Sequence, residues 1–231
     1  MIATFRPPAA AIFDVDGTLI DSVDFHALAW AEAFAEFGVA APFEKVRQQI
    51  GKGGDKLMPI FLSRDQLDAF GEELDDFRGG HFKRKYLGQL RPFAGVRALF
   101  ERLIADGVKI ALASSAKADE LQVYKRIAEI EDLLDAETSS EDAAETKPAP
   151  DIFQAALRQL EGTQEGRILV FGDSPYDALA AGKAGLRSIG VLCGGFSRAS
   201  LSKAGCLAVY RSPSNILVQY ETVFRRVAAG P

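Results

Sequence analysis

Short apolar runs that each end beside a small or acidic residue constrain the fold of this 231-residue chain more than any other feature. Such runs, in which apolar residues do not alternate with polar ones, are typical of strands buried on both faces of a parallel sheet. Amphipathic helical patterns separate them. The runs cover residues 9–13, 108–113, 167–171 and 188–192, and the helical patterns cover 96–105, 151–160 and 175–184. The alternation predicts an α/β fold with a Rossmann-like, doubly wound parallel sheet.

One long stretch departs from this alternation. Residues 23–90 carry helical patterns and no convincing strand, with glycines that predict the turns between helices. We expect residues 23–90 to form an inserted, all-helical cap domain. Residues 1–22 and 91–231 then form the catalytic core. Within the insert, the expected helices cover 25–37, 57–62, 67–77 and 82–90, the last two separated at Gly79 and Gly80.

Composition narrows the classes of protein that the chain can represent. A net charge of −5 disfavours binding to nucleic acid or anionic membranes by bulk charge. The beginning of the chain lacks the apolar core of a signal peptide, and no run approaches a membrane span. The chain has two cysteines, Cys193 and Cys206, which are too few to stabilise a fold of this size through disulfide bonds. They are interpreted as reduced thiols. We therefore expect a cytoplasmic protein, either a monomer or a homodimer.

Polar residues stand where the apolar runs end, and ligands of open α/β sheets bind at that edge. They are Asp14, Asp16, Ser114 and Asp173. Asp14 and Asp16 are two residues apart, so an extended chain points both to the same side. Such a pair can divide its work between a nucleophile or metal ligand and an acid or base. By itself, the pair is equally consistent with an Asp-Gly turn at a strand end.

Four motifs in order resemble those of the haloacid dehalogenase-like hydrolase superfamily. FDVDGT, which contains Asp14 and Asp16, resembles motif one, and ALASS places Ser114 in motif two. TKPAPD places Lys147 in motif three, and GDSPYD resembles the acidic motif four. The helical insert lies between motifs one and two, as in members with an α-helical cap. The resemblance covers nearly the whole chain.

The resemblance implies a role for each motif residue. Asp14 is expected to attack phosphorus and form an aspartyl-phosphate, and Asp16 to protonate the leaving alcohol and then activate water. Ser114 is expected to donate a hydrogen bond to a phosphoryl oxygen. Lys147 is expected to supply positive charge beside the nucleophile and the phosphate. Without the other motifs, Lys147 would be interpreted as part of a turn.

The resemblance also implies Mg²⁺ as cofactor. Asp173 is expected to bind it together with an Asp14 oxygen and the Asp16 carbonyl, since oxygen ligands suit this ion. Asp177 lies four residues after Asp173. It either orients the metal shell or simply stabilises the N-terminus of a helix.

The cap residues carry weaker signals. His26 and Trp30, ten and fourteen residues after Asp16, resemble a His and a Trp in the first cap helix of β-phosphoglucomutase. His26 lies over the active site, or it is a polar tip on a packed helix. Lys52 and Lys56 stand in a glycine-rich stretch. That stretch either meets an anionic group of the substrate or is a flexible connection between helices.

The expected function is a Mg²⁺-dependent phosphomonoester hydrolase, similar to phosphoglycolate phosphatases, that acts on a small phosphorylated metabolite. A β-phosphoglucomutase-like isomerase and a non-catalytic binding protein on the same scaffold remain alternatives. Motif four lacks the paired Glu-Asp of the mutase, and residues 51–55 lack a clear equivalent of its phosphate-binding Arg. Both departures favour the hydrolase.

Overall fold

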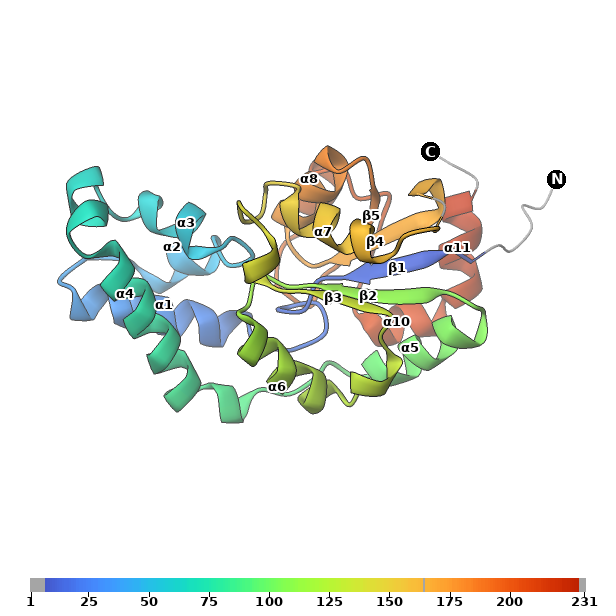
Figure 1. The fold of residues 1–231 in the computed structure, drawn as a ribbon, viewed down its shortest axis with the longest axis horizontal. Helices are drawn as coiled ribbons and strands as arrows, with labels where there is room; N and C mark the ends of the chain where they lie inside the picture. Colours follow the sequence, from blue (N-terminus) through green and yellow to red (C-terminus); the bar gives the residue numbers. More distant parts are fainter. Residues whose placement is uncertain (1–6, 164, 229–231) are drawn as a thin grey trace.

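A single sheet of six parallel strands forms the centre of the molecule in the computed structural model, which describes residues 7–163 and 165–228. The predicted core extends beyond these residues at 1–6, 164 and 229–231, which lie outside the described part. The strand order is β3-β2-β1-β4-β5-β6 (Figure 1). The strands are β1 (Ala10–Phe13), β2 (Lys109–Ala113), β3 (Ala136–Thr138), β4 (Ile168–Gly172), β5 (Arg187–Val191) and β6 (Ala208–Tyr210). This order confirms the predicted doubly wound α/β fold.

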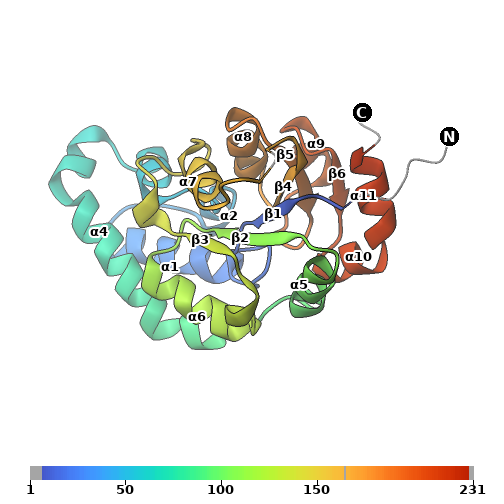
Figure 2. The same cartoon turned by 45° about the vertical axis from the view of Figure 1, so that its right-hand side comes forward.

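Helices cover both faces of the sheet (Figure 2). One face carries α7 (Asp151–Gln159), α8 (Pro175–Lys183) and α9 (Arg198–Lys203). The other carries α5 (Val96–Ala105), α6 (Ala118–Ala128), α10 (Pro213–Val218) and α11 (Tyr220–Ala228).

The side chains of β1 explain why its apolar run does not alternate with polar residues. Ile12 points into the cluster that contains Phe153 of α7. Phe13 points to the opposite face, where its ring lies 4.7 Å from the ring of Phe100 in α5 and 4.5 Å from that of Phe171 in β4, centroid to centroid. Successive residues therefore enter two different cores, and both need apolar side chains.

Residues 23–90, here called the cap segment, form helices beside the carboxyl ends of the strands (Figure 1). Phe34 lies at the centre of a hydrophobic cluster of the segment's own, between α1 and α4. The helices are α1 (Val23–Glu36), α2 (Phe43–Arg47), α3 (Gly54–Leu57) and α4 (Arg64–Lys85). The division into two domains at residues 22/23 and 90/91 stays a prediction.

The helix boundaries predicted near the end of the cap segment were wrong. Residues 67–77 and 82–85 belong to one helix, α4, which runs through Gly79 and Gly80 without a break and ends at Lys85. A capping box between Ser63 and Gln66 begins it. Each glycine costs about 1 kcal/mol of helix stability. The long contact between α4 and α1 offsets that cost.

The edge strands β3 and β6 were not predicted. Each has three residues, too few for a periodic pattern to be detected. β3 lies within the acidic stretch 129–145. Within it, Ala136 and Thr138 are buried. Glu137 accepts a hydrogen bond from Lys125.

Cys193 and Cys206 are both free thiols, as expected.

Among residues 7–163 and 165–228, no helix combines the length and the apolar composition that a membrane-spanning helix needs.

The packing of α5 on the sheet gives a stability prediction. Phe100→Ala removes a fully buried ring that contacts Phe13. We expect it to lower the free energy of unfolding by about 3–5 kcal/mol in urea titrations. Ile104→Ala, on the exposed side of the same helix, serves as the control because its side chain is 42% exposed. Equal losses in the two variants would contradict this description of the core.

Candidate active site

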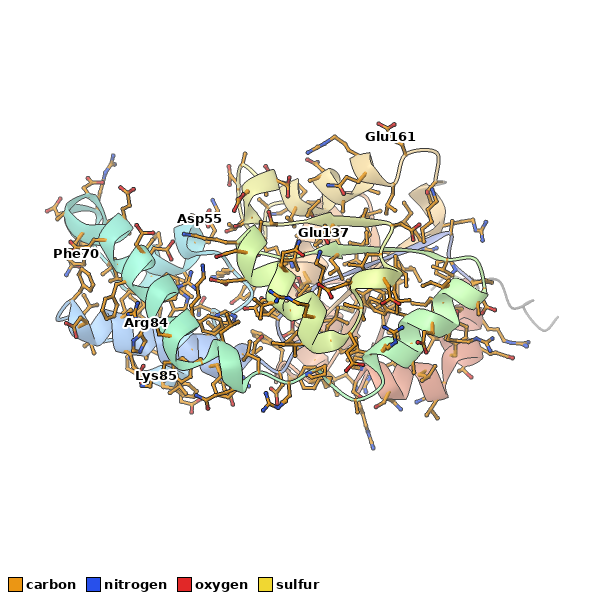
Figure 3. All side chains as sticks on the ribbon, turned by 60° about the horizontal axis from the view of Figure 1, so that its bottom comes forward. Asp55, Phe70, Arg84, Lys85, Glu137 and Glu161 are labelled. Atoms are coloured by element: carbon orange, nitrogen blue, oxygen red, sulfur yellow. The ribbon has the colours of Figure 1, made fainter. Side chains whose placement is uncertain are left out.

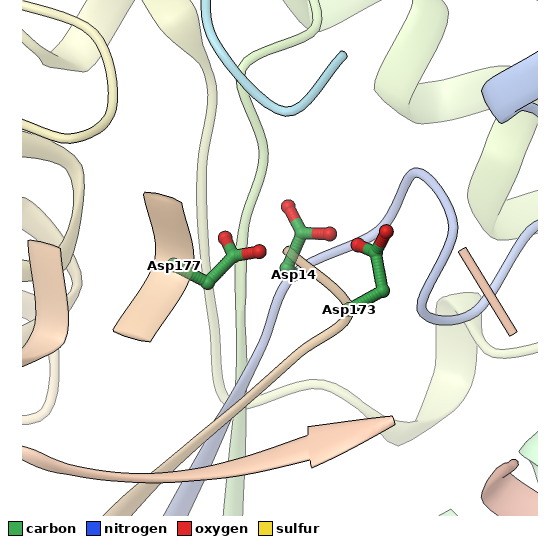
Figure 4. Close-up of side chains that lie close together, drawn as sticks. All are labelled: Asp14, Asp173 and Asp177. Atoms are coloured by element: carbon green, nitrogen blue, oxygen red, sulfur yellow. The ribbon is translucent and has the colours of Figure 1, made fainter. Parts of the chain in front are cut away.

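Three buried carboxylates meet at the carboxyl end of the sheet, next to the cap segment. Asp14 follows β1, Asp173 follows β4, and Asp177 lies in the first turn of α8. Figure 4 shows their side chains close together. They are 6%, 3% and 2% exposed, respectively. Burial of this much negative charge requires compensation.

Lys147 supplies part of that compensation. Its Nζ lies 2.5 Å from Oδ1 of Asp14 and 2.8 Å from Oδ1 of Asp177. It also donates a hydrogen bond to the carbonyl oxygen of Ala113, at 3.1 Å. The side chain is 1% exposed, so the ammonium group is removed from water. Lys147 therefore lies beside Asp14, and its expected role stays a prediction.

One ammonium group does not balance the three carboxylates. Burial, reinforced by the charge of Asp177, raises the pKa of Asp14 to about 7 despite the opposing effect of Lys147. Burial and the charges of Asp14 and Asp177 raise the pKa of Asp173 well above its usual value. Burial alone would lower the pKa of Lys147, but the two carboxylates outweigh it and raise that pKa. The site therefore has an excess of negative charge that a cation would relieve.

The carboxylate oxygens form a cluster of the kind that can hold a metal ion. Ligand oxygens of Asp14, Asp173 and Asp177 all lie within 4.8 Å of one another. Hard oxygen donors are those that Mg²⁺ prefers. The expected set contained the carbonyl of Asp16 rather than the carboxylate of Asp177. Asp177 is also engaged by Ser174, whose Oγ donates to its Oδ2 at 2.6 Å.

Two further residues beside the carboxylates were missed by the sequence analysis. Thr18 Oγ1 lies 3.0 Å from Oδ2 of Asp14 and 3.2 Å from Oδ1 of Asp173, so its single hydrogen joins the two groups. Thr18 belongs to the FDVDGT string, but no role was assigned to it. Gly194 packs so closely on Asp173 that a Cβ atom there would lie 1.6 Å from Oδ2. Because glycine has no polar side chain, the place of Gly194 in the site could not be recognised from the sequence.

Asp16 turns its side chain toward the cap segment. Ser22 Oγ donates to its Oδ1 at 2.6 Å, and His26 Nε2 lies 3.0 Å from the same oxygen. Burial would raise the pKa of Asp16, but His26, Ser22 and the charge of Lys147 outweigh it and lower that pKa. His26 therefore points at Asp16 rather than away from the core.

A cavity of about 310 Å³ lies between the cap segment and the core. Asp14 and Asp16 line it from the core side, and His26, Trp30 and Arg78 line it from the cap side. Its other lining residues are Ile50, Gly51, Lys52, Gly53, Gly54, Asp55, Asp75, Ser115, Ala116, Lys117, Glu120, Ser140, Ala144 and Thr146.

Ser114, the serine expected in the site, is not among the residues that line the cavity. Ser114 is fully buried, and its Oγ accepts a hydrogen bond from the Ala116 N–H at 3.0 Å. Its neighbour Ser115 lines the cavity.

The two cap lysines differ in position. Lys52 lines the cavity, donates to Oε1 of Gln49 at 2.7 Å and lies 4.7 Å from the centroid of the Tyr176 ring. Lys56 instead points outward and pairs with Glu145 at 2.7 Å.

The glycine-rich stretch is seated against motifs three and four. The Gly53 N–H donates to Oγ1 of Thr146 at 3.1 Å, and Thr146 also hydrogen-bonds Asp55, on the side of the cap segment that faces the core (Figure 3). A Cβ atom at Gly53 would lie 2.3 Å from Cγ2 of Thr146. Tyr176 donates to the carbonyl oxygen of Gln48 at 2.7 Å. Glycine at position 53 is therefore needed for a close approach between cap and core.

Arg78 is a cavity residue that the sequence analysis did not identify. Its guanidinium lies 4.8 Å from the Trp30 ring, and Nη2 lies 3.0 Å from Asp75. Its Nε is buried and has no hydrogen-bond partner among the described residues. The predicted helix ended at residue 77, which placed Arg78 in a turn and obscured its position on the face of α4 beside Trp30.

Known proteins resemble this chain in sequence and in fold. The sequence profile of the haloacid dehalogenase-like hydrolases matches residues 11–191. The chain is 32% identical over 186 residues to a phosphoglycolate phosphatase of Nitrosospira multiformis, covering 78% of this chain and 81% of that protein. It is 27% identical over 213 residues to a phosphorylated carbohydrates phosphatase of Thermotoga maritima, covering 90% and 96%. A crystal structure of a hydrolase from Pseudomonas syringae superposes with a TM-score of 0.83 at 27% identity, covering 93% and 98%.

The family profile spans more than half of the chain. The protein therefore belongs to the haloacid dehalogenase-like hydrolase family.

Seating of the glycine-rich stretch is tested by Gly53→Ala. The new Cβ atom would overlap Thr146, so we expect residues 47–56 to separate from the core and exchange amide hydrogens with deuterium several-fold faster. Gly79→Ala is the matched control, because nothing lies within 4 Å of the position of its Cβ atom. Unchanged exchange in Gly53→Ala, measured by mass spectrometry, would show that the contact does not hold the stretch in place.

Proposed function

We propose that this protein is a Mg²⁺-dependent phosphomonoester hydrolase for a small phosphorylated metabolite, of the phosphoglycolate or small sugar phosphate type. The observation that carries the proposal is that two carboxylates with different partners line the same cavity. Asp14 contacts Lys147, Asp16 contacts His26, and both acids line the same space of about 310 Å³. The relatives named phosphoglycolate phosphatase and phosphorylated carbohydrates phosphatase support the choice of substrate class.

The first half of the reaction uses both acids. An Asp14 carboxylate oxygen attacks phosphorus, the bond from phosphorus to the ester oxygen breaks, and an aspartyl-phosphate forms. Asp16 transfers a proton to the departing oxygen. Lys147 holds Asp14 in place and offers positive charge to the phosphoryl oxygens. Ser114 stays the expected hydrogen-bond donor to these oxygens, and its loop brings Ser115 to the cavity.

The second half returns the enzyme to its starting state. Asp16, now without its proton, accepts one from a water molecule, and the resulting hydroxide attacks the phosphorus of the aspartyl-phosphate. The bond between phosphorus and the Asp14 oxygen breaks, and inorganic phosphate leaves. The hydrogen bonds from Ser22 and His26 stabilise the ionised form of Asp16 that this half requires.

Magnesium completes the proposed site. Asp14 and Asp173 would hold the ion, with the Asp16 carbonyl and Asp177 nearby. When bound, it neutralises negative charge on the phosphoryl group.

The position of Arg78 favours a substrate that carries further oxygen atoms at the end away from its phosphate. Arg78 and Lys52 both line the cap side of the cavity, and the buried Nε–H of Arg78 has no hydrogen-bond partner among the described residues. A guanidinium recognises carboxylates well because it offers several donors in one plane. A small phosphorylated acid would therefore place its phosphate at Asp14 and its other end at Arg78.

Replacement of the nucleophile tests the proposed activity. Asp14→Asn should reduce phosphate release from 2-phosphoglycolate by at least about 1,000-fold, because an amide is a poor nucleophile. A chelator should abolish release by the wild type, and added Mg²⁺ should restore it. Both are measured as inorganic phosphate.

Asp132→Asn is the control, because it makes the same change in a side chain that is 64% exposed. Equal activity of Asp14→Asn and the wild type would remove Asp14 from the nucleophile role. Conversion of a sugar phosphate that needs a bisphosphate primer, without net phosphate release, would favour the isomerase.

Arg78→Met tests recognition of the far end of the substrate. We expect the KM for 2-phosphoglycolate to rise roughly 10- to 100-fold, because a charge-assisted hydrogen bond is lost. The KM for p-nitrophenyl phosphate, which lacks the carboxylate, should change little. Arg84→Met, at an exposed position of the same helix, is the control. An equal rise for both esters would contradict the assignment.

A further inference from the structure

Tyr124, on helix α6 of the core, is a buried side chain to which the mechanism above gives no role. It is 1% exposed, and its hydroxyl oxygen lies 3.2 Å from Nε2 of His26. That nitrogen also lies 3.0 Å from Oδ1 of Asp16. The three polar groups therefore meet at one point behind the acid–base carboxylate.

The positions of the hydrogens follow from what each atom can donate or accept. Oδ1 of Asp16 already accepts a hydrogen from Ser22, so it is an acceptor toward His26 as well. Nε2 of His26 must then carry a hydrogen, and it cannot accept one from Tyr124. The phenol oxygen of Tyr124 is therefore the acceptor in this contact and shares the Nε2–H of His26 with Oδ1 of Asp16.

The same arrangement suits both protonation states of Asp16. Oδ1 is an acceptor in the carboxylate, and it is also an acceptor in the carboxylic acid when the proton is on Oδ2. Two donors fixed at Oδ1 therefore favour Oδ2 as the oxygen that carries the proton. Burial and the charge of Asp16 raise the pKa of Tyr124 well above its usual value, so the phenol keeps its own hydrogen.

We propose that Tyr124 is a positioning residue for the acid–base step: it holds His26 against Oδ1 of Asp16 and so leaves Oδ2 to exchange a proton with the leaving oxygen. This inference rests on the proposed hydrolase function. Tyr124 acts through His26 and Asp16 and does not itself contact the substrate.

The two sides of the His26 ring come from different parts of the molecule. The ring stacks on Phe82 of α4, with centroids 4.0 Å apart and planes inclined by 11°. Phe82 belongs to the cap segment, whereas Tyr124 belongs to the core. His26 is therefore fixed only where both parts meet, and Asp16 is oriented when the cap segment is seated.

Dependence on the leaving group distinguishes positioning of the acid from packing. Tyr124→Phe removes one oxygen and keeps the buried ring. We expect kcat for 2-phosphoglycolate, whose alkoxide needs a proton, to fall roughly 10-fold. For p-nitrophenyl phosphate, whose phenolate hardly needs one, kcat should fall by less than about 3-fold. Equal losses for both esters would overturn the proposal.

Tyr86→Phe is the matched control. It removes the same atom from another buried tyrosine, whose hydroxyl donates to Glu32 at 2.9 Å on the cap segment. The ratio of the two kcat values should equal that of the wild type. A shift as large as that of Tyr124→Phe would also overturn the proposal.

A second measurement does not depend on catalysis. The chain has two histidines, so ¹⁵N-resolved NMR of the rings is simple, and His81→Gln assigns the signals. We expect His26 to carry a hydrogen on Nε2 that exchanges slowly with water, and several-fold faster in Tyr124→Phe. A His26 without that hydrogen, or unchanged exchange in the variant, would overturn the proposal. If the wild type hydrolyses neither ester, the proposed function fails, while this spectrum still decides the role of Tyr124.

Discussion

The ion pair of Lys147 with Asp14 and Asp177 is the interaction on which the rest of the site depends. The Lys147 Nζ lies 2.5 and 2.8 Å from these two carboxylates, which arrive on separate elements, after β1 and in α8. Loss of one partner from a buried pair costs about 3–5 kcal/mol, because the remaining charge is left uncompensated. Without Lys147, three carboxylates would repel one another in a space removed from water. With it, negative charge still remains for a metal and for phosphoryl chemistry.

The segment that carries Lys147 also contacts the cap segment. Thr146 contacts Gly53 and Asp55, so the residue before the buried ammonium joins the glycine-rich stretch to the core. On the other side of the cavity, His26 joins the cap to Asp16. The contacts between the cap segment and the core are therefore made by residues that are next to, or part of, those that hold Asp14 and Asp16. This coupling gives a physical reason why an acid–base catalyst would work best when water is excluded.

Much of this arrangement could be predicted from sequence because it lies on strands and motifs. The strand ends place Asp14 and Asp173 at one edge, and the parallel sheet confirms that placement. The contributions of Arg78 and Tyr124 could not be predicted in the same way. Arg78 requires the continuity of α4 through two glycines, which local propensity opposes. Tyr124 meets His26 across 98 residues of sequence, a contact that no local pattern records.

Asp14 is the residue that we propose forms a covalent bond to phosphorus in this cavity. The most direct test is mass spectrometry of the enzyme after rapid acid quenching during turnover of 2-phosphoglycolate with Mg²⁺. We expect the peptide that contains Asp14 to gain a phosphoryl group, and the same peptide of Asp14→Asn to gain none. Phosphate release without any phosphorylated peptide, or with the phosphoryl group on another residue, would contradict it.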